Sequence, residues 1–160
     1  MPRSEALQLI DVLRSKGIRM SAAESCTGGM IGCMMTSISG SSDVFLGSAV
    51  TYSNESKERI LGVSHQTLLD HGAVSEETAR EMAKGAIDVY DSDVSLAVTG
   101  IAGPGGATPE KPVGLVYIAV ADGPRTVVTK NIFEGDRQAV RKQTAVEALK
   151  LLKELAEGRL

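Results

Sequence analysis

Residues 18–38 read IRMSAAESCTGGMIGCMMTSI, and this stretch decides the fold. Ile18 to Ala23 predicts a short strand, and Thr27 to Ile38 predicts a buried helix that is rich in glycine and methionine. A strand that passes almost directly into a helix indicates the alternating architecture of α/β proteins.

The rest of the chain continues this alternation. A first helix is expected to end at Gly17, and Asp122-Gly123-Pro124 is expected to join two strands as a hairpin. The order predicts an α/β fold: a three-layer α/β/α sandwich with a mixed, mostly parallel sheet. The other strands are expected at Val44 to Tyr52, Val94 to Thr99, Leu115 to Val120 and Thr126 to Phe133, and the later helices from Asn54, Ser64, Ser75 and Asp136.

Composition favours a single domain over residues 1–160. The chain has 42% hydrophobic and 23% charged residues, which excludes a disordered or fibrous protein. The longest nearly apolar stretch, Met30 to Met35, is far shorter than the ~20 residues that cross a bilayer. Glu5 and Asp11 interrupt any signal peptide at the N-terminus. We therefore expect no contact with a membrane.

The two cysteines, Cys26 and Cys33, do not form a disulfide framework. On one helix their Cα atoms would lie ~10.5 Å apart. A disulfide needs a separation below ~7 Å. Reduced thiols in a cytoplasmic protein are the expectation.

The formal net charge of −3 argues against nucleic acid as a partner. Residues 125–153 nevertheless carry seven basic and three acidic side chains, whereas the remainder carries ten basic and seventeen acidic ones. A local basic surface in an acidic protein suits a small anionic ligand better than a phosphate polymer. We expect a small-molecule partner, and a homo-oligomer stays an open alternative.

Ligands of such sheets bind outside the carboxyl ends of the strands. Three predicted strands end in segments rich in hydroxyl groups and glycine: Glu24 to Gly29, Tyr52 to Asn54, and Thr99 to Ile101. A loop from Gly100 to Pro112 follows the last of these, and long loops inside compact domains are functional or disordered. These segments are the candidates for a ligand site.

Ser25 is a candidate nucleophile, because it lies where a strand turns into a helix. Such a turn presents free backbone N–H groups and the positive end of a helix dipole, which suit an oxyanion hole. Gly28 and Gly29 would let a ligand approach the backbone closely. On spacing alone, the alternative that Ser25 or Thr27 only caps the helix is favoured.

A catalytic serine needs a base, and histidine is the usual one. The only histidines, His65 and His71, have no carboxylate at a spacing that indicates catalysis or metal binding, so surface or structural roles are favoured for both. Lys57 is the other candidate, because burial lowers the pKa of a lysine and frees its amine to take a proton. Tyr52 would relay that proton or hold the lysine. Spacing alone favours a lysine on the helix surface.

Arg137 and Arg141 begin the last helix and share one of its faces. They are candidates to clamp a phosphate, with an ordinary solvated face as the alternative. Cys26 is expected to be a small buried thiol and not the nucleophile. No Cys, His or Asp cluster has the spacing of metal ligands, so we expect neither a metal nor a cofactor.

Six segments together resemble the CinA C-terminal domain family, the nicotinamide mononucleotide amidohydrolases or nicotinamide-nucleotide deamidases. The resemblance covers essentially the whole chain. Members often carry a larger N-terminal domain, for which 160 residues leave no room, so the chain resembles the stand-alone form of the family. The segments are AESCTGG at 23–29, VTYSNESK at 50–57, HGAVS at 71–75, VTGIAGPGG at 98–106, EKPVG at 110–114 and GDRQAVR at 135–141.

The resemblance implies hydrolysis of the carboxamide of nicotinamide mononucleotide to nicotinate mononucleotide and ammonia, in pyridine nucleotide recycling. It implies Ser25 as nucleophile with Tyr52 and Lys57, and so reverses the preference that spacing gave. The alternative is a non-catalytic nucleotide-binding or regulatory module, related to competence or DNA damage. The residues then expected to bind substrate are Thr27, Gly28, Gly29, Thr99, Gly100, Gly103, Arg137 and Arg141.

Overall fold

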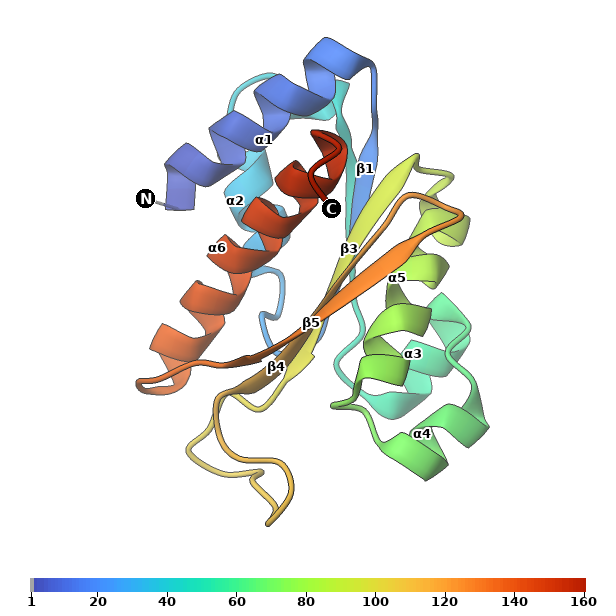
Figure 1. The fold of residues 1–160 in the computed structure, drawn as a ribbon, viewed down its shortest axis with the longest axis vertical. Helices are drawn as coiled ribbons and strands as arrows, with labels where there is room; N and C mark the ends of the chain where they lie inside the picture. The colour runs from blue at the N-terminus through green and yellow to red at the C-terminus, as the bar shows by residue number, and fades with distance from the viewer. Residues whose placement is uncertain (1) are drawn as a thin grey trace.

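The computed structural model describes residues 2–160, and their side chains from residue 5 onward (Figure 1). Within these residues, six α-helices flank a sheet of five strands. No helix among them is long and apolar enough to cross a membrane. The strands are β1 (Met20–Glu24), β2 (Phe45–Val50), β3 (Val94–Gly100), β4 (Leu115–Ala121) and β5 (Thr126–Ile132). The helices are α1 (Pro2–Lys16), α2 (Met30–Thr36), α3 (Asn54–Leu61), α4 (His65–His71), α5 (Glu76–Tyr90) and α6 (Arg137–Ala156), with a 3-10 turn η1 (Ser41–Asp43).

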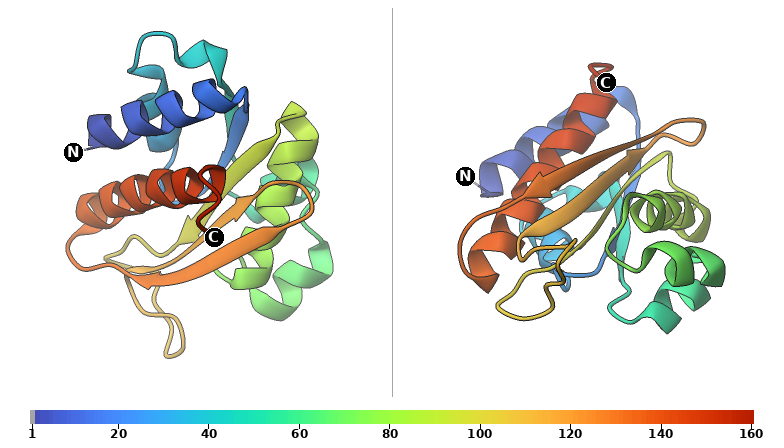
Figure 2. Two further views of the ribbon diagram at one scale, coloured as in Figure 1. Left: turned by 45° about the horizontal axis from the view of Figure 1, so that its top comes forward. Right: turned by 60° about the horizontal axis from the view of Figure 1, so that its bottom comes forward.

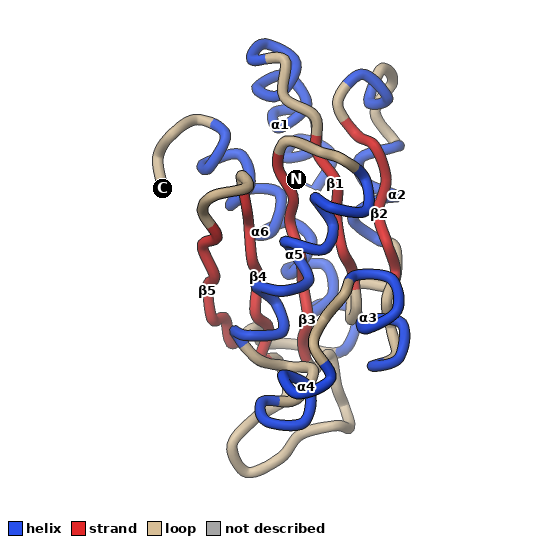
Figure 3. The backbone as a smooth tube through the Cα atoms, turned by 90° about the vertical axis from the view of Figure 1, so that its right-hand side faces the viewer, coloured by secondary structure: helices blue, strands red, loops and turns tan. Residues whose placement is uncertain are grey.

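The strands follow the order β2-β1-β3-β4-β5 across the sheet (Figure 3). β1 pairs in parallel with both β2 and β3, whereas β4 pairs antiparallel with β3 and with β5. The sheet is therefore mixed, as predicted, and β4 runs against the other described strands. The carboxyl ends of β1, β2 and β3 share one edge of the sheet.

Helices cover both faces of the sheet (Figure 1, Figure 2). α1, α2 and α6 lie on one face, and α3, α4 and α5 lie on the other. Each layer of helices buries its own hydrophobic cluster against the strands. This arrangement confirms the predicted three-layer α/β/α sandwich.

Alternation along the central strands separates the two hydrophobic clusters. Leu96, Val98 and Ile118 face the cluster of α1, α2 and α6. Ala97 and Ala119 face the cluster of α5. Because successive residues of a strand point to opposite faces, the same strands present bulky side chains to one layer and methyl groups to the other. The methyl groups let α5 pack close to the sheet.

The segment between β1 and α2 differs from the sequence prediction. The helix expected from Thr27 begins only at Met30. Gly28 and Gly29 precede it with φ angles of 56° and 103°, in the left-handed region that glycine enters without a steric cost. Residues 25–29 therefore form a turn and not the start of a helix.

The later helices begin within one residue of the expected starts, although Ser64 accepts no capping hydrogen bond ahead of α4. Ser75 and Asp136 cap α5 and α6, each accepting a hydrogen bond from the backbone N–H of the third residue of its helix. α3 is capped by Ser53, one residue before the expected Asn54, because the extended backbone at 53 aims its hydroxyl at the helix. The expected hairpin joins β4 and β5, and residues 101–114 form the expected long loop.

α5 and α3 pack closely at Gly85. A Cβ atom there would collide with the backbone carbonyl oxygen of Leu61, the last residue of α3. The contact bears on the candidate site, because α3 also carries Lys57.

We predict that Gly85→Ala lowers the free energy of unfolding by about 1–3 kcal/mol, since no change of rotamer relieves a clash with backbone. The melting temperature should then fall by roughly 3–10 °C in a domain of this size. Gly105→Ala is the matched control, because a Cβ there meets nothing within 4 Å. Thermal unfolding followed by circular dichroism measures both variants. A parental melting temperature for Gly85→Ala would contradict the close packing of the helices.

Candidate active site

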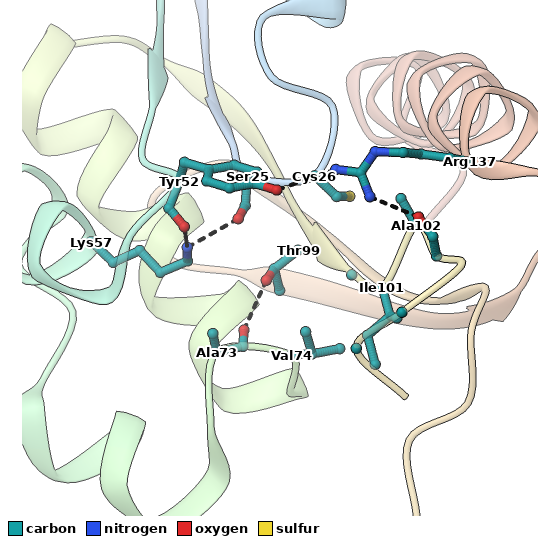
Figure 4. A pocket seen from close by; sticks show the side chains of 14 residues that line it. Ser25, Cys26, Tyr52, Lys57, Ala73, Val74, Thr99, Ile101, Ala102 and Arg137 are labelled. Atoms are coloured by element: carbon teal, nitrogen blue, oxygen red, sulfur yellow. Dashed lines mark hydrogen bonds between the residues drawn. The ribbon is translucent and has the colours of Figure 1, made fainter. Parts of the chain in front are cut away.

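A cavity of about 300 Å³ opens at the edge of the sheet where β1, β2 and β3 end (Figure 4). Its walls come from the turn after β1, the segment between β2 and α3, the loop after β3, the segment before α5 and the first residue of α6. The strand ends singled out in the sequence therefore meet at one place.

Ser25 directly follows β1 and is 8% exposed in the wall of this cavity. The N–H of Gly28 donates to the Ser25 carbonyl oxygen at 3.1 Å and closes a tight turn behind it. In the described part of the chain, the N–H groups of Cys26 and Thr27 donate to no other residue. The turn thus combines a hydroxyl in the cavity wall with two backbone N–H groups next to it that donate to no other residue, that of Cys26 being directed at its own thiol.

Lys57 lies in the first turn of α3, and its side chain is buried, with 1% exposed. Its Nζ lies 3.0 Å from Ser25 Oγ, 2.7 Å from the carbonyl oxygen of Thr51 and 3.3 Å from that of Tyr52. No carboxylate forms an ion pair with Lys57 among the residues that the structure describes. The amine is enclosed by one hydroxyl and two carbonyl groups, and Figure 4 shows the contacts with Ser25 and Tyr52.

Burial disfavours the charged form of this amine and lowers the pKa of Lys57 from its usual 10.5 to about 8. The neighbouring Cys26 acts in the opposite direction. Burial also raises the pKa of Cys26 to about 11, so its thiol stays protonated at neutral pH. A lysine that loses its proton near neutrality, against a serine hydroxyl, has what a base for that serine needs.

Tyr52 and Arg137 join two walls of the cavity. Arg137 donates to the Tyr52 hydroxyl at 3.2 Å and to the Gly103 carbonyl oxygen at 2.7 Å. Tyr52 is 64% exposed, and its backbone carbonyl, not its hydroxyl, accepts from Lys57. Tyr52 therefore contacts Lys57 through its main chain, and its hydroxyl contacts Arg137.

Three further residues expected to bind substrate, Thr99, Gly100 and Gly103, line the cavity. The Thr99 hydroxyl donates to the Ala73 carbonyl oxygen at 2.8 Å. A hydroxyl has a single hydrogen, so toward the cavity the Thr99 oxygen acts as an acceptor. A Cβ at Gly100 would lie 2.8 Å from the Leu115 carbonyl oxygen, so packing alone already requires a glycine there.

The remaining four expected binding residues lie outside the cavity. Arg141 donates to the carbonyl oxygens of Cys26 at 3.0 Å and of Thr27 at 2.9 Å. Gly28, Gly29 and Arg141 line a separate surface depression beside α2, and Thr27 is fully buried. The two arginines therefore differ in place: Arg137 lines the cavity, and Arg141 holds the turn that carries Ser25.

The sequence patterns gave no role to Glu24, the last residue of β1. Its carboxylate is fully buried and accepts hydrogen bonds from two hydroxyl groups and three backbone N–H groups. The available signal was an acidic residue that ends an otherwise uncharged strand, MSAAE, next to a candidate nucleophile.

The histidines and cysteines take no part in the cavity's Ser–Lys contact. His65 and His71 lie on the surface, 3.1 Å from Glu58 and 3.6 Å from Glu77. Cys26 and Cys33 are both free. Over residues 5–160, no group of three or more His, Cys, Asp or Glu side chains is placed to hold a metal ion.

Comparison with known proteins places this chain in a family. Residues 3–156 match the family model of the CinA C-terminal domain. A CinA-like protein from Citrifermentans bemidjiense is 51% identical over 142 residues, which make up 89% of this chain and 34% of that protein. The chain thus spans about a third of the length of this curated relative.

Two solved structures share the fold over nearly their whole length. The competence/damage inducible protein CihA from Agrobacterium tumefaciens is 40% identical with a TM-score of 0.94, over 96% of this chain and 94% of that one. A competence-damaged protein (CinA) superfamily protein from Klebsiella pneumoniae is 30% identical with a TM-score of 0.96, over 99% of both chains. The chain described here belongs to the CinA C-terminal domain family.

Proposed function

We propose that this protein hydrolyses the carboxamide of nicotinamide mononucleotide to nicotinate mononucleotide and ammonia, with Ser25 as nucleophile and Lys57 as base. The observation that carries the proposal is the 3.0 Å contact between Lys57 Nζ and Ser25 Oγ in the wall of the cavity. The choice of substrate rests on the resemblance carried by the six sequence segments.

The surroundings of Lys57 suit a neutral amine that acts as a base. A neutral amine has two N–H donors and one lone pair. The carbonyl oxygens of Thr51 and Tyr52 accept both donors, which leaves the lone pair for the third neighbour, the Ser25 hydroxyl. Ser25 Oγ then attacks the carboxamide carbon while its proton passes to Lys57 Nζ.

The same lysine completes both halves of the reaction. The Lys57 ammonium gives its proton to the leaving nitrogen, so ammonia departs and an ester remains on Ser25. Water attacks this ester as Lys57 takes the water proton, and Lys57 returns that proton to Ser25 Oγ when the acid leaves. The N–H groups of Cys26 and Thr27 are the candidate donors to the negative oxygen of each tetrahedral intermediate.

Two further groups fit the remainder of this substrate. The Thr99 oxygen, whose hydrogen is donated to Ala73, accepts an N–H of the carboxamide. Arg137 brings a positive charge to the cavity wall, and a phosphate would take over the donors that it now directs at Tyr52 and Gly103. The excess of basic side chains over residues 125–153 supports a phosphate at this end.

A second candidate function is a non-catalytic nucleotide-binding or regulatory module. The name of the Agrobacterium tumefaciens relative, a competence/damage inducible protein, favours it. Incubation of the purified protein with nicotinamide mononucleotide separates the two candidates. Release of one ammonia for each nicotinate mononucleotide formed, continuing over many turnovers, supports the amidohydrolase. Binding of nicotinamide mononucleotide without release of ammonia supports the module.

We predict that Ser25→Ala abolishes turnover and leaves folding and ligand binding intact, because it removes the nucleophile alone. Loss of a nucleophile costs roughly 10³-fold or more in kcat. A coupled assay for ammonia measures the rate, and calorimetry measures binding. Ser15→Ala, which removes an exposed hydroxyl on α1, is the matched control. An alanine variant at 25 that kept a tenth of the parent rate would exclude Ser25 as the nucleophile.

We predict that kcat/KM rises with pH through about 8, the pKa of Lys57, because the neutral amine is the active form. Roughly a tenth of the lysine is neutral one pH unit below its pKa, so the rate at pH 7 is about a tenth of the plateau. Lys57→Arg should be nearly as damaging as Lys57→Ala, since a guanidinium keeps its proton. Lys153→Arg, at an exposed amine, is the control. Substantial activity in Lys57→Arg would rule out the base.

We predict that the two arginines separate in a comparison of nicotinamide mononucleotide with its dephosphorylated riboside. Arg137→Ala should weaken binding of the mononucleotide tenfold or more and barely affect the riboside, since a charge-assisted contact to phosphate contributes about 1.5–3 kcal/mol. Arg141→Ala should lower kcat on both ligands alike, because it frees the carbonyl groups of the Ser25 turn. Equal losses for both ligands in Arg137→Ala would show that Arg137 does not contact the phosphate.

A further inference from the structure

Hydrogen bonds converge on the Glu24 carboxylate, which immediately precedes Ser25 in the chain. Its Oε1 accepts from the Thr27 hydroxyl at 2.7 Å, from the N–H of Gly29 at 3.1 Å and from the N–H of Ile31 at 3.0 Å. All three donors are C-terminal to Ser25, whereas Glu24 precedes it. One oxygen atom therefore closes the whole turn that presents the serine.

The second oxygen ties this turn to the neighbouring strand. Oε2 accepts from the N–H of Gly32 at 3.1 Å and from the Ser48 hydroxyl at 2.6 Å. Ser48 belongs to β2, the strand that leads into α3 and so to Lys57. The Glu24 carboxylate thus connects the element that carries Ser25 to the element that carries Lys57.

Glu24 is fully buried, and in the described part of the chain no cation pairs with it. A buried carboxylate is tolerated only when its acceptor sites are filled. Here five donors fill these sites, and none of the five residues that donate lines the cavity. Two of the donors, the N–H groups of Ile31 and Gly32, belong to the first turn of α2, so the carboxylate also caps that helix.

We propose that Glu24 is a positioning residue that holds the Ser25 hydroxyl against the Lys57 amine, without contacting the substrate. The role in catalysis rests on the proposed function, whereas the role in geometry does not. Gly28 and Gly29 make the backbone of the turn flexible. Glu24 restrains it by accepting hydrogen bonds from its N–H groups. Arg141 supplies the matching contacts on the carbonyl side.

The five donors require a carboxylate and not an amide. A glutamine side chain has one acceptor oxygen, and its NH₂ group can only donate. In either orientation of the amide, at least one of the N–H groups of Gly29, Ile31 and Gly32 would face another donor. Glu24→Gln keeps the size of the side chain and removes the positioning.

The test is Glu24→Gln, with kcat, KM and the titration of Lys57 measured on the same protein. We expect kcat to fall about 100-fold at nearly constant KM, since a misplacement of ~1 Å at a reacting group costs about 10²-fold. Carbon NMR of protein labelled at lysine Cε follows Lys57 directly. We expect its pKa to move from about 8 back toward 10.5, as water reaches the amine when the turn loosens.

Two further variants keep the test decisive. Ser95→Ala removes a buried hydroxyl that donates to the Ala83 carbonyl oxygen at 2.6 Å, near the other end of β3. It removes a buried hydrogen bond that does not involve the carboxylate, and it should change neither kcat nor the Lys57 titration. Ser48→Ala removes one of the five donors and leaves the carboxylate in place, so kcat should fall about 3- to 10-fold for one lost charge-assisted bond.

The outcomes separate this proposal from the proposed function. A parent protein that releases no ammonia overturns the function, and the Lys57 titration together with hydrogen exchange at Gly29, Ile31 and Gly32 then decides the role of Glu24. Parental kcat and a parental Lys57 titration in Glu24→Gln overturn the role of Glu24 and leave the function standing. If Glu24→Gln does not fold, Ser48→Ala decides: parental kcat and titration there overturn the proposal.

Discussion

The buried amine of Lys57 is the constraint on which the rest of the site depends. A lysine that is out of water needs hydrogen-bond partners for its amine, and the structure offers two backbone carbonyl groups and the Ser25 hydroxyl. These partners meet because β1 and β2 pair in parallel, with Glu24 opposite Val50. The residues that follow, Ser25 and Thr51, then leave the sheet side by side. A single register between two strands thus creates the contact that the proposed chemistry uses.

The turn that carries Ser25 is held by charges that do not face the cavity. Glu24 binds its N–H groups from one side, and Arg141 binds its carbonyl groups from the other. Arg137, one helical turn before Arg141, lies instead in the cavity wall with Tyr52 and Gly103. Because Glu24 and Arg141 bind the turn from outside the cavity, a glycine-rich turn can hold the Ser25 hydroxyl in a fixed position while the cavity stays accessible to a ligand. It also leaves Arg137 as the charged side chain of the pair that a bound anion can reach.

The sequence was sufficient for the order of elements, the layers and the edge of the sheet where the strand ends meet, because these depend on patterns within single segments. The strands expected at 94–99 and 115–120, the helices expected from Ser75 and Asp136, and the Asp122-Gly123-Pro124 hairpin all rest on local signals. The start of α2 was wrong, because two glycines with positive φ extend a turn where the composition favours a helix.

The burial of Lys57 and the task of Arg141 could not be predicted from spacing. Lys57 stands among Glu55, Glu58 and Arg59, and only the packing of α3 decides which of these side chains turns inward. Arg141 shares a helix face with Arg137, and the reach of its guanidinium to the Ser25 turn depends on how α6 sits beside β1. The resemblance to a family supplied the proposed roles of Ser25 and Lys57, and the long-range pairing of strands explains why these two residues meet.

Mass spectrometry of the protein, quenched in acid at successive times during turnover of nicotinamide mononucleotide, tests the central claim most directly. The account predicts an ester of nicotinate mononucleotide on the peptide that contains Ser25, formed as ammonia is released and lost as the acid is released. Release of ammonia with the adduct on another residue, or with the Ser25 peptide unmodified at every time from milliseconds onward, would contradict the account.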